Sequence, residues 1–439
     1  MYLIYSMLFS LGVILAAPYY WWRKGVTRNP AYWAERFGNV PYQEDRAGAI
    51  WVHAVSLGET LAVAGLVKEL QRLYPERHVY LSHVTPAGRE AGEKRLPTIT
   101  GRFYVPLDWR WTARKALARI KPSLLLVAET ELWPNILRTA RQAGARVVVV
   151  NARMSAHSFR GYQFVRPFLR RVLADVDQIC AQTEEDAERF RRLGAPATAV
   201  RLVGNLKFDA QPPQAGEFAQ ALKTAVRATG RGPVFVAAST MPGEEPLVLE
   251  AWDLIRVRYP QALLILAPRH PARFDSVSED LSRQQRAFVR RTTARRQELA
   301  AQLSGAAILL LDTVGELAGI FELADMVFMG GSLVPTGGHN LLEPAYWSKV
   351  ITFGPHMENF RDIARLFLEA EAALEVRSPQ ELAQASALLE NAQERERLGA
   401  RARRVLEQHS GATARTLECL RPYLLGEAPG RKSMSGEVQ

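Results

Sequence analysis

Two carboxylates follow short apolar segments of the sequence, and each lies where a helix would begin. Glu59 comes just after Val55-Ser56-Leu57-Gly58, and Glu129 comes directly after the run from Leu124 to Ala128. Ligands of parallel α/β sheets bind at the carboxyl ends of the strands, so either carboxylate is placed to act as a general base. The alternative is structural, because a carboxylate in the first turn of a helix also interacts favourably with the helix dipole.

Two cations stand in comparable positions. Lys207 lies in Gly204-Asn-Leu-Lys-Phe-Asp209, where the first domain is expected to end, and Arg269 follows an apolar segment in Pro268-Arg-His-Pro271. A guanidinium can donate two parallel hydrogen bonds to phosphate oxygens. We therefore expect Arg269 to bind an anion and Lys207 to place positive charge near an interdomain crevice.

Phosphate binding is indicated most directly by residues 326–344, MVFMGGSLVPTGGHNLLEP. An apolar run ends at Gly330-Gly331, and Gly337-Gly-His-Asn340 opens an expected helix. Glycine allows close approach of the backbone, and unpaired N–H groups at a helix N-terminus favour phosphate. Asn340 and Glu343 lie three apart, so an amide and a carboxylate could hold two sugar hydroxyls. The alternative is a tight turn with an Asn cap.

A turn and an acidic pair complete the polar segments beside expected strands. Asp312-Thr-Val-Gly-Glu316 precedes an expected helix and is placed to present backbone groups to a base or a sugar. Asp175-Val-Asp177 matches the Asp-x-Asp pattern that holds a metal in many nucleotide-sugar transferases, but it precedes a strand. The eight histidines show no ligand spacing on one helix, so no metal site is expected. We interpret His53 and His339 as structural groups.

Short apolar segments alternating with helix-like segments, such as residues 61–73, must position these side chains. This alternation indicates parallel sheets covered on both faces. It restarts after Ala210-Gln-Pro-Pro-Gln-Ala-Gly216, an expected hinge, so the sequence predicts an α/β protein with two doubly wound, Rossmann-like domains. The expected strands are residues 50–55, 79–84, 103–107, 124–128, 147–150, 179–181, 234–238, 263–267, 308–311, 326–329 and 350–353.

The chain length agrees with two domains, because 439 residues exceed the limit of about 250 to 300 for a single core. The apolar fraction of 48% and the charged fraction of 23% are typical of globular proteins. We predict a membrane anchor over residues 1–22, an N-terminal domain over 23–210, a C-terminal domain over 211–425 and a disordered tail over 426–439.

The formal net charge of +11 calls for an anionic partner. No zinc finger, basic region or aromatic and basic single-strand platform is present, so nucleic acid is not expected. A membrane surface or a phosphorylated substrate fits the charge, and a solvated basic face is the alternative. Cys180 and Cys419 are far apart in sequence, which suggests no disulfide framework and a reducing compartment.

The N-terminal segment from Tyr2 to Tyr20 is uncharged and mostly apolar, and Trp21, Trp22, Arg23 and Lys24 follow it. A segment of this length can just cross a bilayer, and aromatic residues followed by basic ones are the expected interfacial and cytoplasmic flank. No positive charge precedes it, as a signal peptide would require. The sequence predicts a single-pass anchor with the rest of the chain cytoplasmic; a buried core helix is the alternative.

Seven motifs in order carry a resemblance to one enzyme family. They are WVHAVSLGET (51–60), ETELWPN (129–135), NARMS (151–155), AQTEED (181–186), GNLKFD (204–209), PRHP (268–271) and GGHNLLEP (337–344). Together they resemble the 3-deoxy-D-manno-octulosonic acid (Kdo) transferases, which place Kdo on the lipid A precursor of Gram-negative outer membranes. The likeness extends from the anchor to about Asp362.

The resemblance implies an inverting GT-B glycosyltransferase at the inner membrane, with an acceptor-binding N-terminal domain, a nucleotide-binding C-terminal domain and a central crevice. The donor would be CMP-Kdo and the acceptor the lipid A precursor, at an anionic membrane surface and with no cofactor or active-site metal. Glu59 matches the general base, and Glu129 and Lys207 match residues that stabilise the transition state. The CMP-binding positions are Pro268, Arg269, Val314, Gly315, Glu316, Asn340, Leu341, Leu342 and Glu343. Val314 departs from the family, in which Met is common.

Two other functions remain open at this point. One is another GT-B transferase or an epimerase that uses a UDP-sugar, and donor selectivity distinguishes it. The other is a membrane-anchored scaffold that binds a nucleotide sugar without turnover. A scaffold would not need Glu59, Glu129 and Lys207 together.

Overall fold

The computed structural model describes residues 1–22, 30–42, 44, 48–210 and 215–426. These form two compact units, one of residues 1–210 together with residues from His409 onward, and one of residues within 211–408. The basic flank at Arg23, Lys24 and Arg28, most of the expected hinge and the predicted tail from residue 427 lie outside the described residues.

The first unit is built on a parallel sheet of seven strands in the order β3-β2-β1-β4-β5-β6-β7. The sheet order changes direction between β1 and β4, so the chain leaves these two neighbours toward opposite sides. Such a switch point leaves room for a ligand at the carboxyl ends of the strands. The strands are β1 (Ala49–His53), β2 (Val79–His83), β3 (Gly101–Tyr104), β4 (Pro122–Ala128), β5 (Arg146–Ala152), β6 (Gln178–Ala181) and β7 (Val200–Leu202).

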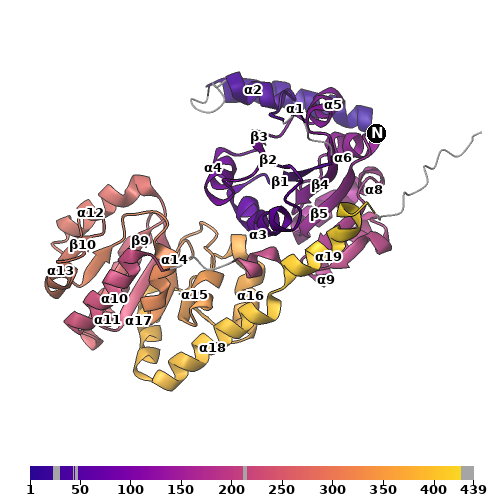
Figure 1. Ribbon diagram of the computed structural model, residues 1–439. Helices are drawn as coiled ribbons and strands as arrows, with labels where there is room; N and C mark the ends of the chain where they lie inside the picture. The colour runs from indigo at the N-terminus through magenta and orange to yellow at the C-terminus, as the bar shows by residue number, and fades with distance from the viewer. Residues whose placement is uncertain (23–29, 43, 45–47, 211–214, 427–439) are drawn as a thin grey trace, which may run out of the picture. The chain divides into compact units, whose positions relative to one another are not determined.

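Helices cover both faces of this sheet (Figure 1). Successive residues of a strand point to opposite faces, and both faces of β1 are apolar: Trp51 packs in one core cluster, while Ile50 and Val52 pack in the other. The helices are α1 (Tyr2–Trp22), α2 (Pro30–Arg36), α3 (Leu57–Leu73), α4 (Pro86–Arg95), α5 (Arg110–Ile120), α6 (Pro134–Gln142), α7 (Ala156–Phe164), α8 (Arg166–Leu173), α9 (Glu184–Leu193), the short η2 (Ala197–Ala199) and η3 (Leu206–Asp209), and α19 (Ala412–Leu424).

The second unit repeats the plan with the order β10-β11-β9-β8-β12-β13-β14, again with parallel pairs. Its switch point lies between β8 and β12. The strands are β8 (Val234–Thr240), β9 (Leu263–Pro268), β10 (Phe288–Arg290), β11 (Ile308–Leu310), β12 (Met326–Met329), β13 (Val350–Phe353) and β14 (Leu374–Glu375).

The remaining helices all belong to the second unit, apart from the last residue of α18. They are α10 (Glu217–Thr229), α11 (Glu245–Arg258), η4 (Pro271–Arg273), α12 (Phe274–Arg283), α13 (Leu299–Gly305), α14 (Leu317–Ile320), η5 (Phe321–Leu323), α15 (Leu342–Tyr346), η6 (Glu358–Phe360), α16 (Arg361–Glu369), α17 (Pro379–Ala385), η7 (Ser386–Glu390) and α18 (Ala392–His409). The prediction of two parallel-sheet α/β domains is confirmed.

The last helix belongs to the first unit, although the sequence placed it in the second. α18 lies in the second unit up to residue 408, and α19 then packs beside α3 and η3 (Figure 1). Ala412, Leu420 and Leu424 of α19 are buried in the same core cluster as Ile50. This return could not be predicted from the sequence, because the pattern of an amphipathic helix does not show which sheet the helix covers.

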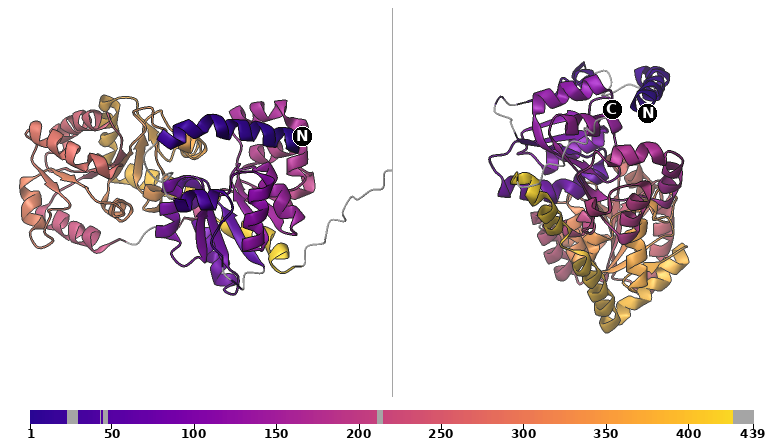
Figure 2. Two further views of the ribbon diagram at one scale, coloured as in Figure 1. Left: turned by 90° about the horizontal axis from the view of Figure 1, so that it is seen from above. Right: turned by 90° about the vertical axis from the view of Figure 1, so that its right-hand side faces the viewer.

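Helix α1, drawn in indigo in Figure 2, has one face fixed to the first unit by polar contacts. The hydroxyls of Tyr2 and Tyr5 donate to Asp175 at 2.7 Å and Asp108 at 2.8 Å, and Trp109 Nε1 donates to Ser10 Oγ at 2.8 Å. The other face exposes large apolar side chains, namely Leu3, Ile4, Met7, Leu8, Leu11, Ile14 and Leu15.

Within the part of the chain that the structure describes, no helix combines the length and the apolar composition required to cross a membrane. The anchor expected over residues 2–20 therefore stays a prediction. The alternative of a buried core helix does not describe α1 either, since much of its apolar surface is exposed.

Candidate active site

Glu59 lies in the first turn of α3, directly after β1. Ser56 caps the helix, and its hydroxyl donates to Glu59 Oε1 at 2.8 Å, while the backbone N–H of Val55 donates to Glu59 Oε2 at 2.8 Å. The carboxylate is thus both a helix-start group and a candidate base. The pKa of Glu59 is raised to about 7, chiefly by burial and to a smaller extent by the charges of Glu131 and Glu129, while the two hydrogen bonds act in the opposite direction.

Glu129 immediately follows β4, the neighbour of β1 across the switch point. Its φ of 52° is in the left-handed region, which is rare for a residue with a side chain. Lys207 Nζ lies 3.4 Å from Glu129 Oε1, and Arg153 Nε lies 3.9 Å from Oε2. The structure therefore brings Glu129 and Lys207 together, as the sequence predicted, although 78 positions separate their numbers in the chain.

Asn151 positions the segment that carries Lys207. Its side-chain oxygen accepts a hydrogen bond from the backbone N–H of Leu206 at 2.9 Å, and its carbonyl accepts from Gln182 Nε2 at 2.9 Å. Asn151 is fully buried and also has a positive φ of 52°. From the sequence, Asn151 was assigned no role beyond its place in a motif. An Asn that follows an apolar strand could have been weighed as such a link, because Asn tolerates this backbone region.

Glu131 is a third acidic group that acts on Glu59, and its role was not predicted from the sequence. Trp133 Nε1 donates to it at 3.2 Å, and burial together with the charge of Glu129 raises its pKa. We call Glu59, Glu129 and Glu131 the carboxylate cluster. Like charges held close together in a partly buried site favour protonation of one member, so the cluster can supply a base that works near neutral pH.

The second group of predicted residues gathers at the carboxyl ends of strands in the second unit. Pro268 ends β9, and the exposed Arg269 is fixed by its backbone N–H, which donates to Thr240 O at 3.0 Å. Burial, followed by the charges of Arg269 and His270, lowers the pKa of His339 to about 4. β9 and β12 both pair with β8 in one parallel sheet, so the end of β9 and the segment that follows β12 lie at the same edge of that sheet.

The segment from Val314 to Glu316 follows β11 in the same sheet. Val314 and Gly315 are exposed, and Gly315 has a φ of 95°. Glu316 is held by Arg291, whose guanidinium donates two hydrogen bonds of 2.8 Å to it. This segment can offer backbone groups to a ligand, whereas the Glu316 carboxylate is already part of an ion pair.

Asn340 and Glu343 do meet, with Asn340 Nδ2 lying 3.5 Å from Glu343 Oε1. Asn340 Oδ1 also accepts the N–H of Leu342 at 3.2 Å, so Asn340 makes a side-chain turn just before α15, whose N-cap position is Leu341. Leu341 and Leu342 point into the core, which leaves only their backbone for a ligand. α15 has five residues, so the contribution expected from a helix dipole is smaller than the sequence suggested.

The first part of the expected phosphate site is occupied by the protein itself. The backbone N–H groups of Gly331, Ser332 and Leu333 all donate to the carboxylate of Glu244. The prediction that the turn at Gly330-Gly331 binds phosphate is therefore wrong, because an internal carboxylate takes these donors. The segment from Gly337 to Glu343 remains as the candidate anion site.

The Asp-x-Asp pattern has a structural use. Asp177 lies 3.3 Å from both Arg141 and Arg146 and accepts the N–H of Val147 at 2.9 Å, while Asp175 accepts from Tyr2. In the described part of the chain, no group of three His, Cys, Asp or Glu side chains is arranged to hold a metal ion. That no metal is needed stays a prediction.

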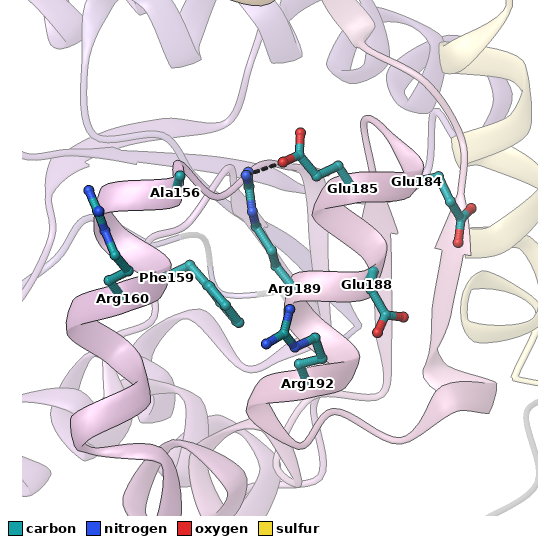
Figure 3. Close-up of a pocket in the computed structure, with 8 residues that line it drawn as sticks. All are labelled: Ala156, Phe159, Arg160, Glu184, Glu185, Glu188, Arg189 and Arg192. Carbon is teal, nitrogen blue, oxygen red and sulfur yellow. Dashed lines mark hydrogen bonds and ion pairs between the residues drawn. The ribbon is translucent and has the colours of Figure 1, made fainter.

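A separate pocket of about 480 Å³ lies between α7 and α9 in the first unit (Figure 3). None of the predicted site residues lines it. Its arginines are largely engaged, since Arg189 pairs with Glu185 and Arg192 lies over the ring of Phe159 at 4.9 Å. The lining residues are Ala156, Phe159, Arg160, Glu184, Glu185, Glu188, Arg189 and Arg192.

Comparison with known proteins identifies relatives of this chain. A family model described as 3-deoxy-D-manno-octulosonic-acid transferase (kdotransferase) matches residues 31–210. A 3-deoxy-D-manno-octulosonic acid transferase from Bordetella pertussis is 37% identical over 95% of this chain and 99% of its own. One from Haemophilus influenzae is 34% identical over 85% of this chain and 87% of its own.

Solved structures share the architecture. A UDP-GlcNAc 2-epimerase from Neisseria meningitidis superposes with a TM-score of 0.53 at 13% identity, covering 86% of this chain and all of its own. The family model and these relatives define the class, a glycosyltransferase, and in this chain it is built from two parallel-sheet units. More particularly, the identities over nearly the whole length show that the chain belongs to the 3-deoxy-D-manno-octulosonic acid (Kdo) transferase family.

Proposed function

We propose that this enzyme transfers Kdo from CMP-Kdo to a lipid A precursor with inversion at the anomeric carbon. The observation that carries the proposal is the buried Glu59, with a pKa of about 7, beside the ion-paired Glu129 and Lys207 in a Kdo transferase. A base with this pKa is half ionised near neutral pH, which suits proton removal from a sugar hydroxyl.

In the proposed reaction, Glu59 accepts the proton of an acceptor hydroxyl, and the hydroxyl oxygen attacks the anomeric carbon of Kdo from the side opposite to CMP. The new C–O bond forms as the bond to the CMP phosphate breaks, and CMP leaves with the bonding electron pair. Inversion follows from this single displacement. Lys207, held against Glu129 at 3.4 Å, supplies positive charge where negative charge develops.

Donor binding is assigned to the second unit. Arg269 is rigidly placed at the end of β9 and exposed, so its guanidinium is available to the phosphate of CMP. Asn340 and Glu343 are placed to bind ribose hydroxyls, and the backbone of residues 314–316 to contact the base. No metal ion or other cofactor takes part in the proposed mechanism.

The function is tested by incubating the purified protein with CMP-Kdo and a tetraacyl lipid A precursor and analysing the products by mass spectrometry. A mass gain of one or more Kdo residues is expected. Product from a UDP-sugar, with none from CMP-Kdo, would favour the alternative donor class. Nucleotide binding without any product would favour the scaffold.

Replacing Arg269 by Ala should weaken CMP binding. A charged hydrogen bond contributes about 1.5 to 3 kcal/mol, and isothermal titration calorimetry measures this loss directly. Arg283→Ala serves as the control, because that arginine is exposed and pairs only locally with Asp280 in the described structure. Equal CMP affinity of Arg269→Ala and the wild type would remove Arg269 from the donor site.

We also propose an inner-membrane location, with α1 at an anionic membrane surface and both units on the cytoplasmic side. The support is the row of exposed apolar side chains on α1 together with the net charge of +11. Apolar side chains partition into the acyl boundary, and basic proteins are attracted to anionic headgroups. A phosphorylated lipid acceptor would be met at that surface.

Protease accessibility tests the orientation. Protease added outside intact spheroplasts should leave the chain whole, and protease added after lysis should digest it. Cleavage of the two units in intact spheroplasts would reverse the proposed topology.

A further inference from the structure

The carboxylate of Glu244 is the centre of a buried set of backbone hydrogen bonds at the second switch point. It lies between β8 and α11 and is fully buried. Oε2 accepts from Gly331 N at 2.6 Å and from Met241 N at 3.1 Å, and Oε1 accepts from Ser332 N at 3.0 Å and Leu333 N at 2.9 Å. One side chain thus joins the loop after β8 to the loop after β12.

Four N–H donors around one carboxyl group require its ionised form. A protonated carboxyl would direct its own O–H toward an N–H donor and could not accept all four bonds. Burial raises the pKa of Glu244, and the four hydrogen bonds act in the opposite direction. Three of the four donors are consecutive, which is the backbone arrangement that proteins use to bind anions.

The hydrogen bonds continue from Glu244 to the candidate donor segment. Gly331 O accepts from Gly338 N at 2.7 Å and from Thr336 Oγ1 at 2.9 Å. Gly338 stands two residues before Asn340. Gly331 has a φ of 68°, and a Cβ there would come within 3.1 Å of the His339 ring, so both the backbone conformation and the space at this position favour glycine.

We infer that Glu244 is a positioning residue for the donor site: its buried carboxylate holds residues 331–333, and through Gly331 it fixes the approach of Gly338 to Asn340. The inference rests on the proposed function, in which residues 337–343 bind CMP. Glu244 itself does not touch the donor. Its charge replaces a bound anion and organises the loop before the donor arrives.

Glu244→Gln is the test, because Gln keeps the size but turns one acceptor into an N–H donor. The KM for CMP-Kdo should rise about tenfold, since misplacement of a positioning loop weakens the contacts it supports. CMP affinity in calorimetry should fall by a similar factor, while kcat changes much less. Glu244→Asp retains the charge and should recover part of the affinity lost in Glu244→Gln.

Asp325→Asn is the matched control. Asp325 lies at the opposite ends of β8 and β12 and accepts the N–H of Val234 at 2.8 Å. The substitution therefore removes a comparable carboxylate next to the same two strands. The KM of Asp325→Asn for CMP-Kdo should equal that of the wild type. An unchanged donor KM in folded Glu244→Gln, or an equal rise in both variants, overturns the inference.

If Glu244→Gln does not fold, a milder variant tests the same inference. Thr336→Val removes only the exposed hydroxyl that donates to Gly331 O, and the donor KM should rise about two- to threefold. An unchanged KM overturns the inference. If the wild type binds no CMP, the proposed donor site is contradicted, and the inference is contradicted with it. If the wild type binds CMP and the variants bind it equally well, only the inference is contradicted.

Discussion

Turnover of Glu59→Gln should fall by about 10² to 10⁴, because Gln keeps the shape of the side chain and cannot accept the acceptor's proton. CMP affinity should not change, since the residues assigned to the donor lie in the other unit. Initial rates at saturating substrate and calorimetry with CMP measure the two quantities separately. Ser56 and Val55 each lose at most one acceptor, so the variant should stay folded.

Glu69→Gln is the control for this result. It changes the same residue type in the same helix, at a half-exposed position paired with Arg72, and should leave turnover unaltered. If Glu59→Gln keeps near-normal turnover while Glu129→Gln abolishes it, the two roles must be exchanged. That exchange is chemically possible because both carboxylates follow strands at the same switch point.

The pH profile gives an independent check on the base. The kcat/KM of the wild type should rise with pH and reach half of its maximum near pH 7, where Glu59 loses its proton. Glu131→Gln removes a neighbouring negative charge, so the pKa of Glu59 should fall and the rise should move to lower pH. A profile that is flat between pH 5.5 and about 8 would exclude Glu59 as the group that titrates.

Lys207→Met should lower turnover by about 10² to 10³, the loss typical of removing one preorganised electrostatic group. Met keeps the approximate length of the side chain and removes its charge. The charge of Glu129 is then less compensated, so the pKa of Glu59 should rise and the pH profile should move to higher pH. Steady-state rates as a function of pH measure both effects.

Lys94→Met is the matched control, because Lys94 is exposed in the same unit and pairs with Glu90 one turn away. Its turnover and pH profile should equal those of the wild type. If Lys207→Met keeps wild-type turnover while Glu129 is still required for activity, the proposed role of Lys207 as the partner of Glu129 is contradicted.

The sequence was sufficient to predict the central strands of both sheets. Strands such as β4 and β12 are buried on both faces, so they appear as continuous apolar runs, and residues 326–329 were predicted with their observed bounds. β7, β10 and β14 were missed. They are two or three residues long and lie at or near the sheet edges, where polar residues such as Arg201 and Glu375 interrupt the apolar pattern.

For the site, residue types at strand ends were enough to predict which groups gather, as the contact of Glu129 with Lys207 shows. Residue types were not enough to show which of these groups already bind another part of the protein. Glu244 is 87 positions from Gly331, and Arg291 is 25 from Glu316, so neither pairing leaves a local pattern. A glycine-rich turn that binds a ligand and one that binds an internal carboxylate look alike in sequence.

The return of α19 to the first sheet affects how the chain folds as it is made. Buried side chains of this helix complete a core cluster whose other members lie mostly between residues 50 and 206. During synthesis from the N-terminus, that cluster stays open on one side until the whole second unit has left the ribosome. The core of the first unit can therefore be completed only after the whole second unit has been synthesised.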